Sequence, residues 1–277
     1  MTDCPVVPLN NGTLIPQLGF GVFQVPPDEA QRCVSQALDV GYRHLDTAAM
    51  YQNEKGVGAA IAASGVARED IFVTTKLNND AHGYDSALAA CATSLANLGL
   101  DYVDLYLIHW PLPARDRYLD TWRAFEKLHA EGMARAIGVS NFTIPHLQRL
   151  ATDSQTVPAV NQVELHPYLV QQELRNYDAQ HRIVTQAWSP IARGGDLLQD
   201  PAITALASKY GKTPAQVVLR WHLDLGNVVF PKSVTPARIA ENFDVFDFSL
   251  EQPDLAAITA LNRDERIGPD PDTFDGG

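Results

Sequence analysis

Residues 105–109 read Leu-Tyr-Leu-Ile-His, a short apolar run that ends in a polar side chain. Runs of this kind alternate along the chain with longer segments of helical period, and that alternation predicts a parallel sheet. The eight predicted strands are Leu18–Gly21, His44–Asp46, Ile71–Lys76, Leu105–His109, Ala136–Val139, Ala159–Glu164, Ile183–Ala187 and Val228–Phe230. Eight strand–helix repeats in 277 residues favour a closed (β/α)8 TIM barrel of α/β class, forming one domain over residues 1–277.

The segments between the predicted strands have apolar residues at helical spacing. We expect helices at Asp28–Asp39, Asn53–Ser64, Tyr84–Leu98, Leu119–Glu131, Pro145–Thr152, Gln171–Gln180, Thr213–Leu225 and Pro236–Asn242. Two extra helices in the C-terminal part, Pro201–Tyr210 and Glu251–Asn262, lie outside the repeat. Before the first strand, the turn residues Asn10-Asn11-Gly12 are typical of an N-terminal β-hairpin.

A doubly wound nucleotide-binding sheet is the alternative arrangement of such repeats, and its glycine-rich fingerprint tests between the two folds. The only candidate stretch is Gly56-Val57-Gly58-Ala59-Ala60-Ile61. It lies inside a helical segment instead of at a strand-to-helix turn, so its glycines are predicted to allow close helix packing. The barrel is therefore the favoured fold.

The composition excludes several classes of partner. A net charge of −12 without a cluster of Lys and Arg opposes the attraction on which nucleic-acid binding depends. Residues 1–10 lack a basic segment followed by an apolar one, and no apolar run reaches the roughly 18 residues of a membrane helix. Cys4, Cys33 and Cys91 are odd in number and widely spaced, which argues against disulfides. We expect a cytoplasmic protein, with a monomer as the default.

Nearly every predicted strand ends in a polar side chain. These residues are Asp46, Lys76, His109, Ser140-Asn141, Gln162 with Glu164, Trp188-Ser189, and Lys232-Ser233. Each one alone has an ordinary structural explanation, as a helix cap, a core histidine or a solvated lysine. In a barrel, however, the carboxyl ends of all strands surround one cavity. Their joint placement therefore predicts an active site at that end.

Tyr51 lies five residues beyond Asp46, in the loop that follows the second predicted strand. A phenol has an ordinary pKa near 10, which makes it a poor proton donor at neutral pH. The ammonium of Lys76 would lower the pKa of Tyr51, and the carboxylate of Asp46 would keep that lysine charged. His109 can polarise a substrate carbonyl through an imidazole N–H. Because these residues store no electrons, a cofactor must supply the hydride.

Four stretches of the chain resemble the aldo-keto reductase superfamily, and in pattern its bacterial 2,5-diketo-D-gluconate reductase branch. They are Gly41-Tyr42-Arg43-His44-Leu45-Asp46-Thr47-Ala48, Leu105-Tyr106-Leu107-Ile108-His109-Trp110-Pro111, Gly138-Val139-Ser140-Asn141-Phe142 and Phe230-Pro231-Lys232-Ser233. The resemblance implies NADPH-dependent reduction of small aldehydes and ketones, such as dicarbonyls, keto sugars or keto acids. It also implies that Tyr51 is the proton donor and that Asp46, Lys76 and His109 are its partners.

A set of cofactor residues is implied by the same resemblance. Trp188 is implied to stack on the nicotinamide, and Ser140, Asn141 and Gln162 to bind its carboxamide. The loop from Ser189 through Pro190 and Ile191 to Gly195 matches the family's pyrophosphate loop, where backbone N–H groups can approach an anion. The implied 2′-phosphate site comprises Lys232, Ser233 and Arg238. Further expected cofactor contacts are Val234, and Glu241 with Asn242, which share a helix face with Arg238. Two cations at the 2′-phosphate site favour NADPH over NADH, although Arg238, Glu241 and Asn242 could instead form a solvated helix face.

The implied substrate pocket comprises Phe23, Ala49, Asn78 and Trp110. Asn78 departs from the branch, whose members often carry Trp there, so a wider or more polar pocket is expected on that side. Residues 266–277 are too rich in Pro, Gly and Asp to form a helix. In the family such tails shape substrate choice; because this one is short, an open site that accepts many small carbonyls is expected.

Three other functions stay open at this point. Lys76 on a barrel strand could form a Schiff base, as in an aldolase. The chain could also be a nucleotide-sensing regulatory subunit, since relatives of this fold bind NADPH and report redox state to a partner. A metal-dependent hydrolase has the least support, because Glu164-Leu165-His166 alone is a poor match to metal-ligand spacing and no metal is expected.

Overall fold

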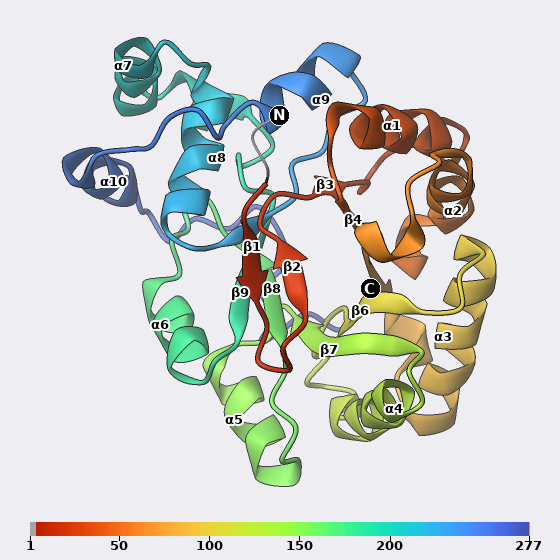
Figure 1. The fold of residues 1–277 in the computed structure, drawn as a ribbon. Coiled ribbons are helices and arrows are strands. Elements are labelled where there is room, and N and C mark those ends of the chain that lie inside the picture. The colour runs from red at the N-terminus through yellow and green to blue at the C-terminus, as the bar shows by residue number, and fades with distance from the viewer. Residues whose placement is uncertain (1–3, 277) are drawn as a thin grey trace.

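The computed structural model describes residues 4–276, and its centre is a barrel of eight parallel strands (Figure 1). The strands are β3 (Phe20–Gly21), β4 (His44–Asp46), β5 (Phe72–Leu77), β6 (Val103–Ile108), β7 (Ala134–Ser140), β8 (Val160–Glu164), β9 (Val184–Trp188) and β10 (Val228–Val229). Each strand pairs with its neighbour in the chain. The barrel closes where Leu18 pairs with Val229 and the Gly19 N–H donates to the Val229 carbonyl at 2.7 Å. The predicted barrel is confirmed.

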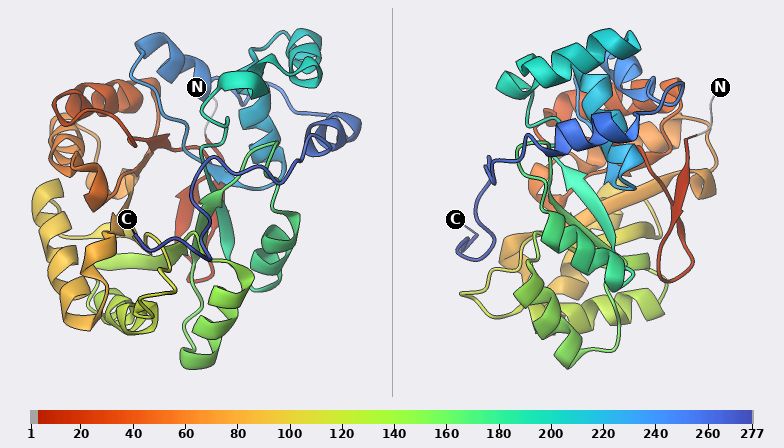
Figure 2. Two further views of the ribbon diagram at one scale, coloured as in Figure 1. Left: turned by 180° about the vertical axis from the view of Figure 1, so that it is seen from behind. Right: turned by 90° about the vertical axis from the view of Figure 1, so that its left-hand side faces the viewer.

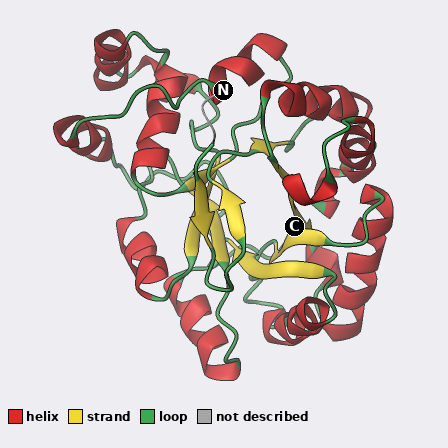
Figure 3. Ribbon diagram, in the orientation of Figure 1, coloured by secondary structure: helices red, strands yellow, loops and turns green. Residues whose placement is uncertain are grey.

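Helices surround the barrel, as Figure 3 shows in red around the yellow strands. Those that follow the eight strands are α1 (Pro27–Val40), α2 (Glu54–Ala63), α3 (Tyr84–Leu98), α4 (Tyr118–Ala130), α5 (Ile144–Asp153), α6 (Gln172–Gln180), α8 (Pro214–Asp224) and α9 (Pro236–Phe243). The extra helices are α7 (Pro201–Tyr210), which lies between β9 and α8, and α10 (Gln252–Thr259). All ten were predicted; α10 ends three residues before the predicted Asn262.

The N-terminal hairpin closes the amino end of the barrel. Strands β1 (Val6–Pro8) and β2 (Leu14–Pro16) pair antiparallel around the predicted turn. Leu9 and Ile15 pack with the inward side chains Leu105 and Leu107, whereas Tyr106 between them packs toward the helices. Figure 2 shows the hairpin and the C-terminal tail at opposite ends of the barrel. The carboxyl end, where the tail lies, is therefore the end left for a site.

The glycines of α2 serve helix packing, as predicted. A Cβ on Gly58 would lie 2.0 Å from the Leu98 carbonyl oxygen, and one on Gly56 would lie 2.7 Å from the Ala30 Cβ. Both distances are too short for any larger residue, so α2 packs against α1 and α3 at close range.

The first and last barrel strands, β3 and β10, are shorter than predicted, but all eight predicted strands are present. β3 is the two residues Phe20–Gly21, and β10 ends at Val229, one residue before the predicted end. Pro231 follows shortly after β10 and has no N–H to donate, which limits the ladder there. The tail forms no helix among its described residues, as predicted, while residues 1–3 and Gly277 lie outside the described range.

Candidate active site

Lys76 lies buried at the carboxyl end of β5 and joins two of the predicted catalytic residues. Its Nζ donates to Asp46 Oδ1 at 2.6 Å, to the Thr47 carbonyl at 2.9 Å and to the Tyr51 hydroxyl at 3.4 Å. Asp46 ends β4, and Tyr51 ends the short 3-10 helix η1 (Ala49–Tyr51) that follows it. Parallel pairing of β4 with β5 brings these side chains together, as the strand-end pattern predicted.

Burial acts against the charged forms of this cluster. It works to lower the pKa of Lys76, but Asp46 and Tyr51 together raise that pKa above its ordinary value, so the ammonium stays charged. Burial raises the pKa of Tyr51 more than the Lys76 charge lowers it. Lys76 lowers the pKa of Tyr51, as expected, but burial outweighs that effect. Lys76 offsets part of the cost of burial and does not reverse it.

His109 follows β6, and its ring and that of Tyr51 form a T-shaped pair with the ring centroids 5.8 Å apart. Burial, with the Lys76 and His82 charges acting in the same direction, holds the pKa of His109 well below its ordinary value. The imidazole is therefore neutral at physiological pH. Its Nδ1 is buried and has no hydrogen-bond partner within residues 4–276. A neutral ring can donate one N–H to a carbonyl oxygen without adding a second positive charge beside Lys76.

The ends of β7, β8 and β9 form a connected polar rim. Trp188 donates from Nε1 to Asn141 Oδ1 at 2.7 Å, and Asn141 Nδ2 donates to the His109 carbonyl at 2.9 Å. Ser140 Oγ donates to the Gln162 carbonyl at 2.8 Å. This rim joins the predicted nicotinamide residues to the loop that carries His109.

Gln162 has a contact that its sequence position did not reveal. Its Nε2 donates to Asp46 Oδ2 at 2.8 Å and to Gln186 Oε1 at 2.9 Å, while its Oε1 has no described hydrogen bond. The side chain therefore supports the Asp46 carboxylate and still offers Oε1 as an acceptor. Gln186, wholly buried in β9, was missed by sequence reasoning. The only indication in the sequence was a polar residue inside the predicted strand Ile183–Ala187.

The loop after β9 fits an anion. Ser189, Ala192 and Arg193, followed by Gly194 and Gly195, all have positive φ. The chain turns tightly through hydrogen bonds from Ala192 N to the Ser189 carbonyl and from Gly194 N to the Ile191 carbonyl. Among the residues that the structure describes, the N–H groups of Ile191 and Arg193 have no acceptor. Such unpaired donors in a tight turn are suited to a phosphate.

Two exposed cations lie at the predicted 2′-phosphate site. Neither Lys232 nor Arg238 forms an ion pair with any described carboxylate. Ser233 Oγ accepts from the Thr235 N–H at 3.1 Å, and the Val234 carbonyl accepts from Arg32 at 3.3 Å. On α9, Glu241 Oε1 accepts from Thr213 at 2.8 Å, and Asn242 is buried. The free positive charges fit a dianionic group, whereas Glu241 is already engaged within the protein.

Two of the predicted substrate residues, Phe23 and Ala49, lie beside Tyr51. Phe23 packs against the Tyr51 ring at 5.1 Å between centroids, and Ala49 is half-buried in the same turn as Tyr51. Asn78 caps the 3-10 helix η3 (Asn79–Ala81) by accepting from the Asn79 N–H at 2.9 Å. An aromatic residue could not make that cap.

The C-terminal tail reaches across the barrel to Trp110. Phe274 packs on Trp110 at 4.5 Å between ring centroids, and Trp110 is only 7% exposed. In the left view of Figure 2 the dark blue tail crosses in front of the strands. The candidate pocket therefore has a wall on the Trp110 side, where an open edge was expected.

Within residues 4–276 there is no group of three or more metal-ligating side chains. None of the helices described there could span a membrane.

The surroundings of Lys76 bear on the Schiff-base alternative. Lys76 is charged and makes three hydrogen bonds, which is a poor state for a Schiff-base nucleophile.

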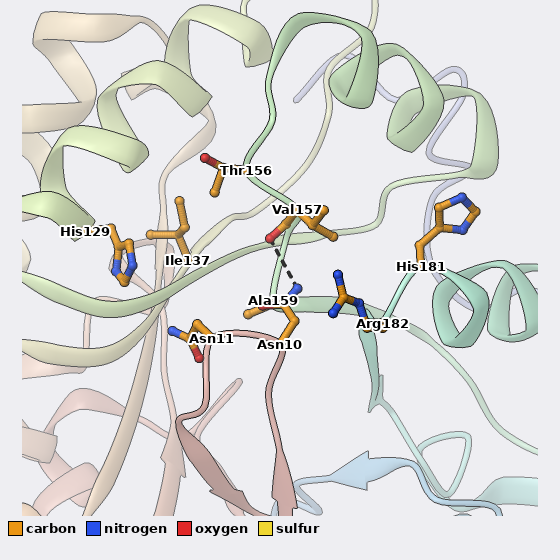
Figure 4. Close-up of a pocket in the computed structure, with 9 residues that line it drawn as sticks. All are labelled: Asn10, Asn11, His129, Ile137, Thr156, Val157, Ala159, His181 and Arg182. Carbon is orange, nitrogen blue, oxygen red and sulfur yellow. Dashed lines mark hydrogen bonds between the residues drawn. The ribbon is translucent and has the colours of Figure 1, made fainter.

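Two pockets in the described part of the chain lie away from the cluster of Asp46, Tyr51 and Lys76. One of about 220 Å³ is lined by residues such as Asn10, His129 and Arg182 near the amino ends of the strands (Figure 4). The other, of about 770 Å³, lies beside α5, α6 and the tail.

A closed parallel barrel with a carboxylate, an ammonium, a phenol and a neutral imidazole at its carboxyl rim is typical of a barrel enzyme. Residues 17–263 match the model of the aldo/keto reductase family. The chain belongs to that family and is an oxidoreductase that acts on carbonyl groups.

Similar proteins align with nearly the whole chain. Methylglyoxal reductase DkgA of Escherichia coli (strain K12) is 50% identical over 277 residues, covering 100% of both chains. A crystal structure of an aldo/keto reductase from Brucella melitensis is 56% identical with a TM-score of 0.92, covering 94% of this chain and 99% of that one. A mutant of Gox0644 in complex with NADPH is 46% identical with a TM-score of 0.94, covering 98% of each chain.

Proposed function

We propose that this protein reduces small aldehydes and ketones to alcohols with NADPH, and that Tyr51 donates the proton to the carbonyl oxygen. The observation that carries the proposal is the position of Lys76, whose Nζ lies 2.6 Å from Asp46 and 3.4 Å from the Tyr51 hydroxyl. Lys76 is the charge that stabilises a phenolate as the proton leaves Tyr51. When bound, NADPH supplies the hydride.

The chain's own residues divide the remaining work. Asp46 keeps Lys76 charged, and Gln162 holds the other oxygen of that carboxylate. His109 stays neutral and offers an N–H to the carbonyl oxygen, which orients the substrate against Tyr51. Phe23 and Trp110 would provide apolar walls for the substrate.

The nucleotide is proposed to lie along the rim from Trp188 to α9. Trp188 would contact the nicotinamide ring, with Ser140, Asn141 and the free Oε1 of Gln162 at its carboxamide. The donors of Ile191 and Arg193 would hold the pyrophosphate, and Lys232 with Arg238 the 2′-phosphate. None of these four groups has a described anionic partner, which fits this assignment. The NADPH and NADP complexes of two solved relatives fit it as well.

Small dicarbonyls are the proposed substrates, with keto sugars and keto acids as further candidates. Relatives with 50% identity over the whole chain are methylglyoxal reductases. The Asn78 cap leaves no bulky side chain at that edge of the pocket, and the tail closes the side of Trp110. Acceptance of several small carbonyls, and not of one compound alone, is the expected substrate profile.

The deciding experiment follows the loss of NADPH absorbance with methylglyoxal, phenylglyoxal and a diketo sugar acid. Tyr51→Phe removes the proton donor and is expected to lower kcat roughly a thousandfold while leaving the Kd for NADPH nearly unchanged. Tyr84→Phe is the matched control, because Tyr84 is exposed on α3. Equal turnover by Tyr51→Phe and wild type would exclude Tyr51 as the donor. NADPH binding without turnover of any carbonyl would favour a regulatory subunit.

A further inference from the structure

Glu164 is a buried carboxylate that the proposed reaction does not use. It ends β8 with its side chain 0% exposed. Oε1 accepts from the Ile267 N–H at 2.6 Å and from His166 Nε2 at 3.0 Å, and Oε2 accepts from the Gly268 N–H at 3.0 Å. Burial favours the neutral acid, but these donors together hold the pKa of Glu164 below its ordinary value. The carboxylate is therefore charged, and two of its partners belong to the tail.

Glu164 lies beside Trp188. The two residues are register partners in the pairing of β8 with β9, at the rim of the barrel. The tail residue that Glu164 binds is in contact with the same indole, since a Cβ on Gly268 would lie 2.4 Å from Trp188 Cη2 and 3.0 Å from Glu164 Oε2. Only glycine can approach the ring so closely. The carboxylate thus holds the backbone of Gly268 against the edge of Trp188.

The indole of Trp188 is fixed from both ends. At its other end, Nε1 donates to Asn141 Oδ1, and Asn141 in turn holds the carbonyl of His109. Beyond Gly268 the tail continues to Asp272, which accepts from Thr143 Oγ1 at 2.9 Å, and to Phe274 on Trp110. A single segment therefore contacts both the proposed nicotinamide residue and the wall of the proposed substrate pocket.

We propose that Glu164 is a positioning residue for the cofactor: its carboxylate fixes Ile267 and Gly268 so that the tail orients the Trp188 indole for the nicotinamide ring. The inference rests on the proposed function only for the identity of the ring that Trp188 contacts. It predicts that attachment of the tail and affinity for the nucleotide change together, even though Glu164 itself touches no nucleotide.

Attachment of the tail can be measured without any cofactor. Trypsin cleaves after Arg266, directly before the Ile267 N–H that Glu164 binds, and releases residues 267–277. Glu164→Gln replaces one acceptor oxygen by an NH2 group that faces an N–H donor. Cleavage after Arg266, followed by mass spectrometry, is expected to become roughly tenfold faster in this variant. Glu173→Gln, an exposed change on α6, is the matched control and should cleave like wild type.

Nucleotide binding tests the coupling to Trp188. The Kd values for NADPH and for NADH are expected to rise by the same factor in Glu164→Gln, about three- to tenfold, because the change affects the nicotinamide end that both share. Gly268→Ala should produce the same equal loss by displacing the indole. This second variant lies in the tail and leaves the barrel core intact, so it covers the case in which Glu164→Gln does not fold.

The outcomes separate this inference from the proposed function. Faster cleavage with unchanged Kd values in both variants would overturn the coupling and leave the proposed function intact. Equal cleavage of wild type and Glu164→Gln would show that Glu164 does not hold the tail. Failure of the wild-type protein to bind either nucleotide would overturn the proposed function, and the coupling with it. A loss confined to NADPH would place the effect at the 2′-phosphate and not at Trp188.

Discussion

Gln162 and Asp46, 116 residues apart in the chain, are joined by a hydrogen bond of 2.8 Å from Nε2 to Oδ2 inside the barrel. The other oxygen of Asp46 accepts from Lys76, so both carboxylate oxygens are paired. Burial raises the pKa of Asp46, while Lys76 and Gln162 counteract it. The hydrogen-bonded cluster of Lys76 and Asp46 thus extends across the barrel to β8.

Replacing Gln162 with Leu should therefore impair catalysis as well as nucleotide binding. Asp46 would lose one of its paired oxygens, and the charge on Lys76 would be less well supported. We expect kcat to fall roughly tenfold, as for one lost hydrogen bond to a charged group. Single-turnover rates at saturating NADPH measure this loss. A raised Kd with an unchanged single-turnover rate would limit Gln162 to the cofactor, and Gln180→Leu on the exposed face of α6 is the control.

Lys76→Met should destabilise the protein as well as inactivate it. The change leaves the buried Asp46 carboxylate without its cation, which costs about 3–5 kcal/mol of unfolding free energy. Asp46→Asn combined with Lys76→Met removes both charges, so the double variant should be more stable than the sum of the single losses implies. Urea denaturation measures the three values. Strictly additive losses would show that the pair at 2.6 Å does not interact energetically.

Arg238→Ala should weaken NADPH far more than NADH. Arg238 is exposed and forms no ion pair with a described residue, so its removal costs the fold little. Loss of one charge-assisted contact to the 2′-phosphate is expected to raise the Kd for NADPH roughly ten- to a hundredfold. Fluorescence titration with both nucleotides checks this, with the exposed Arg123→Ala as control. The same loss for both nucleotides would exclude Arg238 from the 2′-phosphate site.

Asp178 should make stability depend on pH. It is buried on α6, and burial raises its pKa to about 7 although Thr185 and Asn161 donate to it. Between pH about 4 and 7 the folded chain binds this proton more tightly than the unfolded chain, so its contribution to stability falls as pH rises. Above pH 7 the penalty is constant. Asp178→Asn should flatten the unfolding free energy between pH 4 and 7, and an unchanged slope would show that Asp178 is ionised throughout.

The strands, and the grouping of the candidate catalytic residues at the carboxyl end of the barrel, could be predicted because their signals are local. An apolar run such as Leu105–Ile108 identifies a strand wherever it packs, and the residue after it must lie at the rim of a closed barrel. The grouping of Asp46, Lys76 and His109 followed from that rule alone. The assignment of the nucleotide residues needed the family resemblance, because a tryptophan or serine at a strand end has no chemistry that identifies a nicotinamide.

Sequence by itself thus determined the barrel, its helices and which polar residues share its carboxyl end, because periodicity and residue type act over a few neighbours. Only the tertiary structure decided that Gln162 supports Asp46, that burial raises the pKa of Tyr51, and that Glu164 binds the tail 103 residues further along the chain. Those outcomes depend on distances of a few ångströms between distant segments, and on water excluded from around a charge. Neither quantity is set until the barrel has closed and the tail has crossed it.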